Sequence, residues 1–371
     1  MLTTGTGSER LMDFLAIKKA WEILRRPDVC APPYHVQLEV TTHCNMACYM
    51  CVRNEVIKHP QHLAFDDYLR IFDQTRPRKL TLSGAGEPLL CPDLVRMIAH
   101  ARSHGTSMMI PSNGTLLLRP EVAQGIVEAK LNVIKISIDA ATPQTYHAIR
   151  RQDCFDKIIE GIERVNELKT RRASRWPEMR FDVVILKENC TELAEIVKLA
   201  ARLKVGTVFF RALQATGIGG RRERVIGKDV DFDGLHRSVR QGICEARRLG
   251  IRTNLKDVAR DFQAYRSLYV KQDASMSNQV CLLPWLQCFI SVRGELSPCC
   301  ATYTNAGFSA GNVLKEGFEA VWNGERMQAL RRQFRKRQNT FAVCRDCIPR
   351  SLPVLVKMSS MLPGFVFAHR L

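Results

Sequence analysis

The stretch Val36–Cys51, VQLEVTTHCNMACYMC, decides the prediction of the fold. Its first half alternates apolar and polar residues, as a strand with one buried face does. Its second half places Cys44, Cys48 and Cys51 in a C-x3-C-x2-C pattern directly after that strand. Thiolates on one loop suit an iron–sulfur cluster and zinc alike, so the spacing and the surroundings must decide between the two.

The spacing of these cysteines favours iron. Structural zinc sites need four ligands, which usually come as paired C-x2-C units, and only the Cys48–Cys51 pair is present here. His43 is the nearest fourth ligand, but it stands beside Cys44 and is poorly placed to point at the same metal. Three thiolates can bind three irons of a cubane cluster and leave the fourth iron open, so we expect a [4Fe-4S] cluster.

Strand-like and helical segments alternate after this loop. The expected strands are 35–41, 79–83, 107–111, 132–138, 180–186, 206–211 and 250–254, and the expected helices are 66–75, 92–104, 120–129, 155–170, 191–203 and 234–249. Such alternation predicts a parallel sheet covered by helices, and the absence of G-x-G-x-x-G after the first strand argues against a dinucleotide-binding sheet. The fold class we predict is α/β, a partial (β/α)6 TIM-like barrel with a small C-terminal cysteine-rich α+β domain.

The triad and its flanking residues resemble the signature of the radical S-adenosylmethionine (radical SAM) superfamily. The resemblance implies that the open iron binds S-adenosylmethionine and that the reduced cluster cleaves it to a 5′-deoxyadenosyl radical. Met50 stands before the third cysteine, where the family often has an aromatic residue. Its polarizable thioether can still pack on adenine, and Tyr49 is adjacent.

Further cofactor-binding residues are implied by the same resemblance, at the ends of successive strands where barrel active sites assemble. They are Gly84, Gly86 and Glu87 for the ammonium group, Ser112 and Asn113 after the third strand, Ser137 and Asp139 for the ribose, Arg150 for the methionine carboxylate, and Asn189 for the adenine pocket. Two alternatives stay open: Asp139 as a helix cap and Asn189 as an ordinary loop residue.

A second cysteine group, Cys281, Cys299, Cys344 and Cys347, supplies four thiolates, enough for a fully ligated cubane cluster. Gly294 permits a tight turn before Cys299. The group resembles the SPASM or twitch extension of radical SAM enzymes, in its shorter form with one auxiliary [4Fe-4S] cluster. Cys288 or Cys300 is an alternative ligand, and zinc is an alternative metal. We expect Cys91, Cys154, Cys190 and Cys244 to be core residues.

These patterns divide the chain into five parts. They are residues 1–33 with an amphipathic helix at 10–26, the barrel at 34–255, a linker at 256–280, the auxiliary-cluster domain at 281–349 with one helix at 317–337, and a basic, apolar tail at 350–371. We expect the tail to pack on the barrel, with contact to a membrane surface as the alternative.

The chain has 55 Lys and Arg against 37 Asp and Glu, a formal charge of +18, which favours an anionic partner. The basic runs Arg171–Arg175, Arg221–Arg224 and Arg331–Arg337 are typical of solvated helix faces. Nothing resembles a nucleic-acid-binding motif. Without a secretory signal or an apolar stretch of roughly 20 residues, the expected location is the cytoplasm.

The resemblance implies a function: hydrogen abstraction from a small-molecule substrate, phosphorylated or otherwise anionic, with a flavodoxin or ferredoxin as reductant. The auxiliary cluster then takes part in electron transfer, and oxidation, epimerisation and C–C bond formation all remain open. We favour a small substrate because residues 1–33 are too few for a separate peptide-recognition domain. A peptide or tetrapyrrole-type cofactor maturase is the alternative enzyme, and an iron–sulfur or zinc structural protein is the alternative outside enzymes. No catalytic acid, base or hydrogen donor is assigned.

Overall fold

The computed structural model describes residues 31–212, 230–260, 262, 283–336 and 341–345. Packing contacts divide the chain into two units, which are taken one at a time below. Unit 1 comprises Met1–Gln37, Arg70–Pro77 and Ser275–Leu371, and unit 2 comprises Leu38–Leu69 and Arg78–Ala274. The expected helix at 10–26, the run Arg221–Arg224 and the tail at 350–371 lie outside the described residues.

Strands and helices alternate along unit 2, as the sequence predicts. The strands are β2 (Lys79–Leu82), β3 (Ser107–Ser112), β4 (Val133–Ser137), β5 (Glu178–Ile185), β6 (Thr207–Ala212) and β7 (Arg252–Thr253). The helices are α2 (Arg53–Val56), α3 (Phe65–Thr75, which continues into unit 1), η1 (Pro88–Leu90), α4 (Leu94–Ser103), α5 (Pro120–Glu128), α6 (Pro143–Arg150), α7 (Phe155–Arg171), α8 (Leu193–Arg202), α10 (Phe232–Leu249) and α11 (Leu255–Arg260). Helix α6 is not among the predicted helices.

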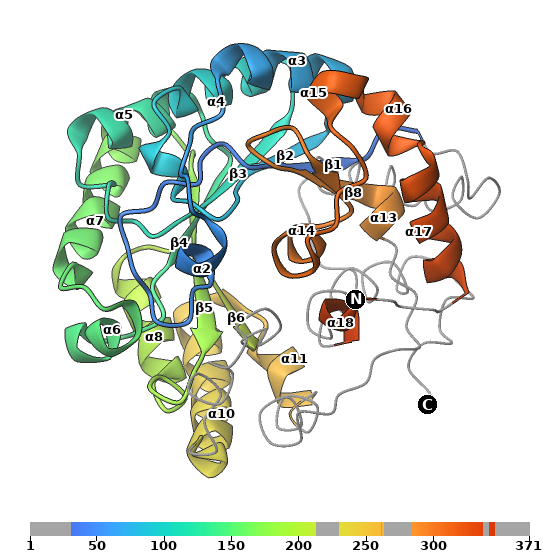
Figure 1. The fold of residues 1–371 in the computed structure, drawn as a ribbon. Helices are drawn as coiled ribbons and strands as arrows, with labels where there is room; N and C mark the ends of the chain where they lie inside the picture. Colours follow the sequence, from blue (N-terminus) through green and yellow to red (C-terminus); the bar gives the residue numbers. More distant parts are fainter. Residues whose placement is uncertain (1–30, 213–229, 261, 263–282, 337–340, 346–371) are drawn as a thin grey trace, which may run out of the picture. The chain divides into compact units, whose positions relative to one another are not determined.

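The strands of unit 2 run parallel in the order β7-β6-β5-β4-β3-β2. Leu38 is the last residue of the first strand, β1 (His35–Leu38), and belongs to unit 2, where its carbonyl accepts from the Ser83 N–H at 2.9 Å. Figure 1 shows α4, α5, α7 and α8 as an outer layer around the strands. This is the predicted partial (β/α)6 barrel, and the fold class is confirmed.

The two faces of the strands carry different residues. In β5, Met179, Phe181, Val183 and Ile185 are buried and alternate with half-buried residues. The buried face points to the helices, because a Cβ added at Gly114 would lie 3.0 Å from Ile158 of α7 and 3.1 Å from Ile136 of β4. Since side chains alternate along a strand, Lys135, Ser137 and Asp182 lie on the opposite, inner face.

Unit 1 contains the second cysteine group and is a small α+β structure. Its described elements are α13 (Leu283–Leu286), β8 (Gln287–Ile290), β9 (Leu296–Ser297), α14 (Cys300–Ala306), α15 (Val313–Glu316), α16 (Phe318–Trp322), α17 (Glu325–Arg335) and α18 (Ala342–Arg345). The strand order is β1-β8-β9, and β8 and β9 are antiparallel, with Phe289 opposite Ser297. Gly294, in the turn between β8 and β9, has φ +84°, a backbone conformation that favours glycine.

The single helix predicted at 317–337 is wrong, because the segment forms two helices, α16 and α17. The break falls at Asn323 and Gly324, where Gly324 has an extended backbone with φ −69° and ψ 164°. A Cβ added at Gly324 would lie 2.6 Å from the Ala320 carbonyl oxygen, so the turn needs glycine. The buried apolar residues have helical spacing on each side of the break taken separately, and a reading of spacing alone joins the two sides into one helix.

Two further predictions are corrected. Arg331 does not lie on a solvated face: it is fully buried, its Nε donates to the Pro284 carbonyl at 3.1 Å, and its guanidinium stacks 4.4 Å from the centre of the Trp322 ring. Cys244 is exposed and not a core residue, because it lies away from the buried face of α10. Cys91, Cys154 and Cys190 are buried, as predicted. Among the described residues, no helix is long and apolar enough to cross a membrane.

Candidate active site at the Cys44–Cys51 loop

The loop that carries Cys44, Cys48 and Cys51 is held by backbone hydrogen bonds. The Thr42 N–H donates to the Gln61 carbonyl at 3.0 Å, and the Leu63 N–H donates to Val40 at 2.9 Å. Arg53 of α2 donates from Nε to the Thr42 carbonyl at 2.8 Å. The Cys51 N–H donates to the Cys48 carbonyl at 3.0 Å, so these two thiols lie on either side of one turn.

The donor set of this loop is three cysteine thiols, which suits a cubane cluster. Across the described parts of the chain, no group of three His, Cys, Asp or Glu side chains is arranged to hold one metal ion. A cubane cluster bonds its cysteines to different irons, so the three sulfurs need not converge on one point. Burial raises the pKa of the Cys44 thiol, and its proton must leave when a metal binds, because the thiolate is the ligand. The His43 ring is stacked on the His62 ring, with ring centres 4.4 Å apart.

The turn Gly84–Glu87 lies directly against the start of the cysteine loop. The Ala85 N–H donates to Glu39 Oε1 at 2.8 Å. A Cβ added at Gly84 would lie 2.2 Å from Glu39 Cγ, and one at Gly86 would lie 2.5 Å from the carbonyl oxygens of Thr41 and His43. At Gly86 the neighbouring atoms are backbone, so glycine is required there to bring the end of β2 to the loop, whereas at Gly84 the Glu39 side chain would have to move.

Glu87 is buried, and its carboxylate joins the ends of β2 and β3. Oε1 accepts from Ser112 Oγ at 2.8 Å and from the Leu89 N–H at 3.1 Å, and Oε2 accepts from the Asn113 N–H at 2.7 Å. Burial raises the pKa of this carboxyl, and the bonds from Asn113, Ser112 and Leu89 oppose the rise. A carboxylate has about four acceptor positions, and three of them are used here. Contact with the cofactor's ammonium group stays a prediction.

The side chain of Asn113 is tied to the cysteine loop through Asn45. Asn113 donates from Nδ2 to Asn45 Oδ1 at 2.9 Å, Asn45 donates to Thr115 Oγ1 at 2.8 Å, and Thr115 Oγ1 donates to Asn113 Oδ1 at 2.7 Å. This closed triangle fixes the loop between Cys44 and Cys48 to the end of β3. Sequence reasoning missed Asn45, although its place inside the triad offers a signal.

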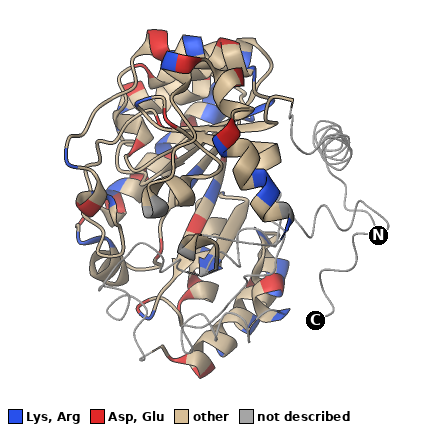
Figure 2. Ribbon diagram, turned by 45° about the vertical axis from the view of Figure 1, so that its right-hand side comes forward, with Lys and Arg blue, Asp and Glu red and all other residues tan. Residues whose placement is uncertain are grey.

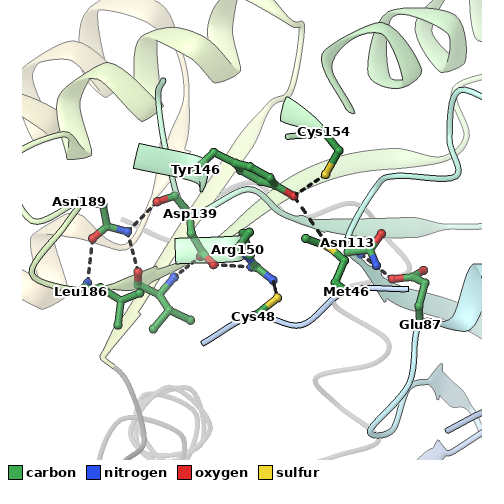
Figure 3. A network of polar contacts seen from close by, with 11 residues as sticks. Met46, Cys48, Glu87, Asn113, Asp139, Tyr146, Arg150, Cys154, Leu186 and Asn189 are labelled. Atoms are coloured by element: carbon green, nitrogen blue, oxygen red, sulfur yellow. Dashed lines mark hydrogen bonds and ion pairs between the residues drawn. The ribbon is translucent and has the colours of Figure 1, made fainter. Parts of the chain in front are cut away.

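Asp139, Arg150 and Asn189 come together at the end of β4, as Figure 3 shows. Asp139 is fully buried, with φ +49°; its Oδ1 accepts from the Val184 N–H at 2.7 Å, and its Oδ2 accepts from Arg150 Nη2. Asn189 donates to the carbonyls of Asp139 at 2.7 Å and Val184 at 2.8 Å. Burial raises the pKa of the Asp139 carboxyl, and the Arg150 guanidinium opposes that rise.

Arg150 connects this carboxylate to the cysteine loop. It is the last residue of α6, which begins at the Thr142 cap and Pro143 and ends at Arg151 in the left-handed conformation. Its Nη1 donates to Cys48 Sγ at 3.5 Å (Figure 3). Burial alone would lower the pKa of the guanidinium, but the interactions with Asp139 and Cys48 raise it by more than burial lowers it. The pKa therefore lies above its ordinary value, and Arg150 stays charged. Its buried Nε makes no hydrogen bond to the part of the chain that the structure describes.

Tyr49 and Met50 lie in an apolar cluster beside this ion pair. Together with Val52 and Val184 they pack against Ile149 and Leu186. The Tyr49 hydroxyl donates to Glu188 Oε2 at 2.9 Å, and burial together with Glu188 raises the pKa of Tyr49. Glu188 is a second residue that sequence reasoning missed. Ser137, on the inner face of β4, lies opposite Asp182 of β5 in the strand register.

Two of the four predicted auxiliary-cluster ligands, Cys281 and Cys347, lie outside the described residues. Cys299 and Cys344 are half-buried, and α14, which Cys299 caps, packs against α18, which carries Cys344. Cys300 is also half-buried, whereas Cys288 is fully buried in β8. The ligand set of this second cluster stays a prediction.

The chain matches two family models. The model of the radical SAM superfamily matches residues 38–200, and the model of the SPASM iron–sulfur cluster-binding domain matches residues 281–348. The first match contains every element of the cysteine loop and its surroundings described above. The second contains all four cysteines of the C-terminal group.

Curated relatives match over most of the chain. The mycofactocin maturase MftC of Mycobacterium tuberculosis (strain H37Rv) is 26% identical over 318 residues, which are 85% of this chain and 75% of MftC. The AdoMet-dependent heme synthase of Methanosarcina barkeri is 23% identical and covers 81% of this chain and 85% of its own.

Solved structures share the fold. Streptococcus suis SuiB bound to S-adenosylmethionine superposes with a TM-score of 0.64 at 15% identity, over 89% of this chain and 74% of SuiB. Because the family models find both domains in the order that the sequence predicts, the resemblance is confirmed. The chain is a radical SAM superfamily enzyme with a C-terminal SPASM-type iron–sulfur domain.

Proposed function

We propose that the enzyme removes a hydrogen atom from a small anionic substrate bound on the inner face of its barrel. The observation that carries this proposal is a series of three hydrogen bonds that joins the cysteine loop to strand β5. The bonds run from Cys48 to Arg150, from Arg150 to Asp139, and from Asp139 to Val184. When bound, the reduced [4Fe-4S] cluster and S-adenosylmethionine supply a 5′-deoxyadenosyl radical. The protein's own task is to bind, orient and shield that chemistry.

The residues around the loop divide this task. Cys44, Cys48 and Cys51 would hold the cluster, and the Gly84–Glu87 turn would present backbone carbonyls to the cofactor. Tyr49 and Met50 form an apolar wall that suits an adenine ring, since they pack with Val52 and Val184. Ser112, Asn113 and Asn189 are tied to backbone or to other side chains, so they contribute mainly by fixing the strand ends.

Deuterium transfer tests the proposal. Reconstituted, reduced enzyme would be incubated with S-adenosylmethionine and with extracts of cells grown in deuterated medium, separated into small anionic, small neutral or cationic, and peptide fractions. We expect 5′-deoxyadenosine to gain one deuterium with the small anionic fraction. Formation of 5′-deoxyadenosine without deuterium from any fraction would contradict hydrogen abstraction from these pools.

A peptide or cofactor maturase is the second candidate, and the relatives favour it. MftC is named a maturase, and SuiB has been solved bound to the precursor peptide SuiA. Deuterium transfer from the peptide fraction alone, or a mass change in a peptide co-expressed with the enzyme, would select this candidate over the first.

Several finer assignments belong to the proposal. Cys281, Cys299, Cys344 and Cys347 would hold the auxiliary cluster, within a domain at 281–349 that follows a barrel at 34–255. A flavodoxin or ferredoxin would deliver electrons, which the net charge of +18 favours because such carriers are acidic. The clustered thiols suit a reducing compartment, so we place the enzyme in the cytoplasm.

A further inference from the structure

We propose that Arg150 raises the reduction potential of the cluster bound at the cysteine loop, by donating a hydrogen bond to the ligand sulfur of Cys48. Asp139 is the positioning residue, since it holds the Arg150 guanidinium in place. The inference rests on the proposed function, because it takes Cys48 as a ligand of that cluster. It gives Arg150 a task that does not depend on contact with the cofactor's carboxylate.

The Arg150 guanidinium is fixed between a sulfur and a carboxylate. Its Nη1 donates to Cys48 Sγ at 3.5 Å, and its Nη2 donates to Asp139 Oδ2. Asp139 is in turn held by β5, because its Oδ1 accepts from the Val184 N–H at 2.7 Å. A thiolate sulfur that is bound to iron still accepts N–H donors, and hydrogen bonds to the sulfurs help to set the potential of an iron–sulfur cluster.

Helix α6 and the turn after it hold the cysteine loop beside Arg150 on both sides of Cys48. Three further hydrogen bonds do this: the Gln152 Nε2 to the Asn45 carbonyl at 3.2 Å, the Tyr146 hydroxyl to Met46 Sδ at 3.9 Å, and the Tyr49 N–H to the Ile149 carbonyl at 3.4 Å. Figure 3 shows the contacts of Met46 and Cys48 with α6. The contact between Arg150 and Cys48 is therefore built into the loop and does not depend on one flexible side chain.

Burial makes this contact stronger than the same contact at the surface. The Arg150 and Asp139 side chains are 10% and 0% exposed. Figure 2 shows charged residues on the outer helices as well. There, at the ends of α7 and α5, the paired Arg172 and Glu128 side chains are 56% and 46% exposed. Water and salt screen such surface charges, whereas a buried pair is screened much less.

Reduction of the cluster changes its charge next to this donor. One electron enters from the ferredoxin or flavodoxin of the proposed function, and no proton or leaving group is exchanged. The reduced form carries one more negative charge, so a cationic N–H donor on the ligand sulfur stabilises the reduced form more than the oxidised form. Arg150 therefore makes the cluster easier to reduce. The Asp139 carboxylate offsets part of this effect, because it lies on the other nitrogen of the same guanidinium.

Reduction potentials of the reconstituted protein, measured in redox titrations followed by electron paramagnetic resonance, test the proposal. S-adenosylmethionine is left out, so that contact of Arg150 with the cofactor does not contribute. The signal of the cysteine-loop cluster is the one that disappears when Cys44, Cys48 and Cys51 are all replaced by Ala. Arg150→Gln should lower the potential of this signal by the equivalent of about tenfold in the reduction equilibrium, or about 59 mV for one electron. The other signal should not move.

Asp139→Asn gives the opposite sign. It keeps an oxygen that can accept from Arg150 but removes the negative charge beside the guanidinium, so the potential should rise. A merely structural role of the pair would move the potential in the same direction in Asp139→Asn and Arg150→Gln. If Arg150→Gln does not fold, the double variant Asp139→Asn, Arg150→Gln takes its place, and its potential should lie below that of Asp139→Asn.

The matched control is Arg151→Gln, which removes an equal charge from the next residue. Arg151 is exposed, and its guanidinium lies 5.7 Å from the centre of the Tyr49 ring. Since water and salt screen an exposed charge, the potential should stay within the equivalent of about twofold in the reduction equilibrium.

Three results would overturn the proposal: an unchanged or higher potential in Arg150→Gln, an equal fall in Arg151→Gln, or a fall in Asp139→Asn. If one signal is absent from the triple Ala variant while Arg150→Gln leaves the potential unchanged, the cysteine ligands stand and only the task of Arg150 falls. A triple Ala variant that keeps both signals would overturn the ligand assignment and the proposal with it.

Discussion

Arg150 links the cysteine loop to the end of strand β4. It contacts both a buried carboxylate and the sulfur of Cys48, and it comes from a helix that the sequence pattern did not predict. The sequence resemblance assigned Arg150 to the cofactor's carboxylate. The structure adds an ion pair with Asp139, which no spacing rule reveals, because the two residues are brought together only when α6 folds back on β4.

The first prediction concerns this ion pair. Arg150→Gln leaves the Asp139 carboxylate buried without its countercharge, so we expect the free energy of unfolding to fall by about 3–5 kcal/mol. Denaturant unfolding of the anaerobic protein measures this. Arg172→Gln, which breaks an exposed pair, should cost under about 1 kcal/mol. The double variant Asp139→Asn, Arg150→Gln should recover part of the loss. Similar losses of stability in Arg150→Gln and Arg172→Gln would contradict this account.

The second prediction concerns two cysteines outside the clusters. Cys91 is 4% exposed, and burial raises the pKa of its thiol to about 11 from an ordinary 9.0, whereas Cys244 is exposed. The thiolate is the reactive form. At pH 9 iodoacetamide should therefore modify Cys244 well before Cys91 in the native protein, and both alike in denaturant. Peptide mass mapping measures the order, and early modification of Cys91 would be inconsistent with its burial.

The raised pKa of Cys91 also fixes the sign of its effect on stability. Between pH 9 and about 11 the folded protein keeps a proton that the unfolded chain loses. The contribution of Cys91 is therefore fully present below pH 9 and is lost as the pH rises through about 11.

At the scale of elements, the glycine turn after β2 sets the position of the cysteine loop. Gly86→Ala would place a methyl group 2.5 Å from two backbone carbonyl oxygens, so the turn must move away from the loop. We expect a loss of about 1–3 kcal/mol in stability and lower iron occupancy after reconstitution.

Gly206→Ala is the control for this third prediction, because a Cβ there meets nothing within 4 Å. Iron content after reconstitution and the thermal unfolding temperature are measured for Gly86→Ala and Gly206→Ala and compared. Unchanged iron in Gly86→Ala would show that the close approach of the turn is not needed to form the cluster site.

The elements themselves were largely predictable, because strand and helix periodicities are local signals. All seven strands predicted in the barrel region occur, with ends that differ by a few residues. The break between α16 and α17 was missed because it depends on the approach of Gly324 to the Ala320 carbonyl, which the periodicity does not contain. Arg331 was misplaced for a similar reason: its partners, Pro284 and Trp322, are set by tertiary packing.

At the scale of the whole molecule, the order of the two cysteine groups was the most informative feature. The radical SAM and SPASM matches cover the regions in which the sequence placed the two clusters. The net charge of +18 indicated an anionic partner but not its location.

The measurement that tests the central claim most directly is 5′-deoxyadenosine formation by the anaerobically reconstituted, dithionite-reduced enzyme. The account predicts that the wild type and Cys244→Ser, which alters an exposed cysteine outside both groups, form it from S-adenosylmethionine at similar rates. Cys48→Ala should form none. Iron-loaded wild type that forms no 5′-deoxyadenosine, or Cys48→Ala that forms as much as the wild type, would contradict the assignment of Cys44, Cys48 and Cys51 as the ligands of the catalytic cluster.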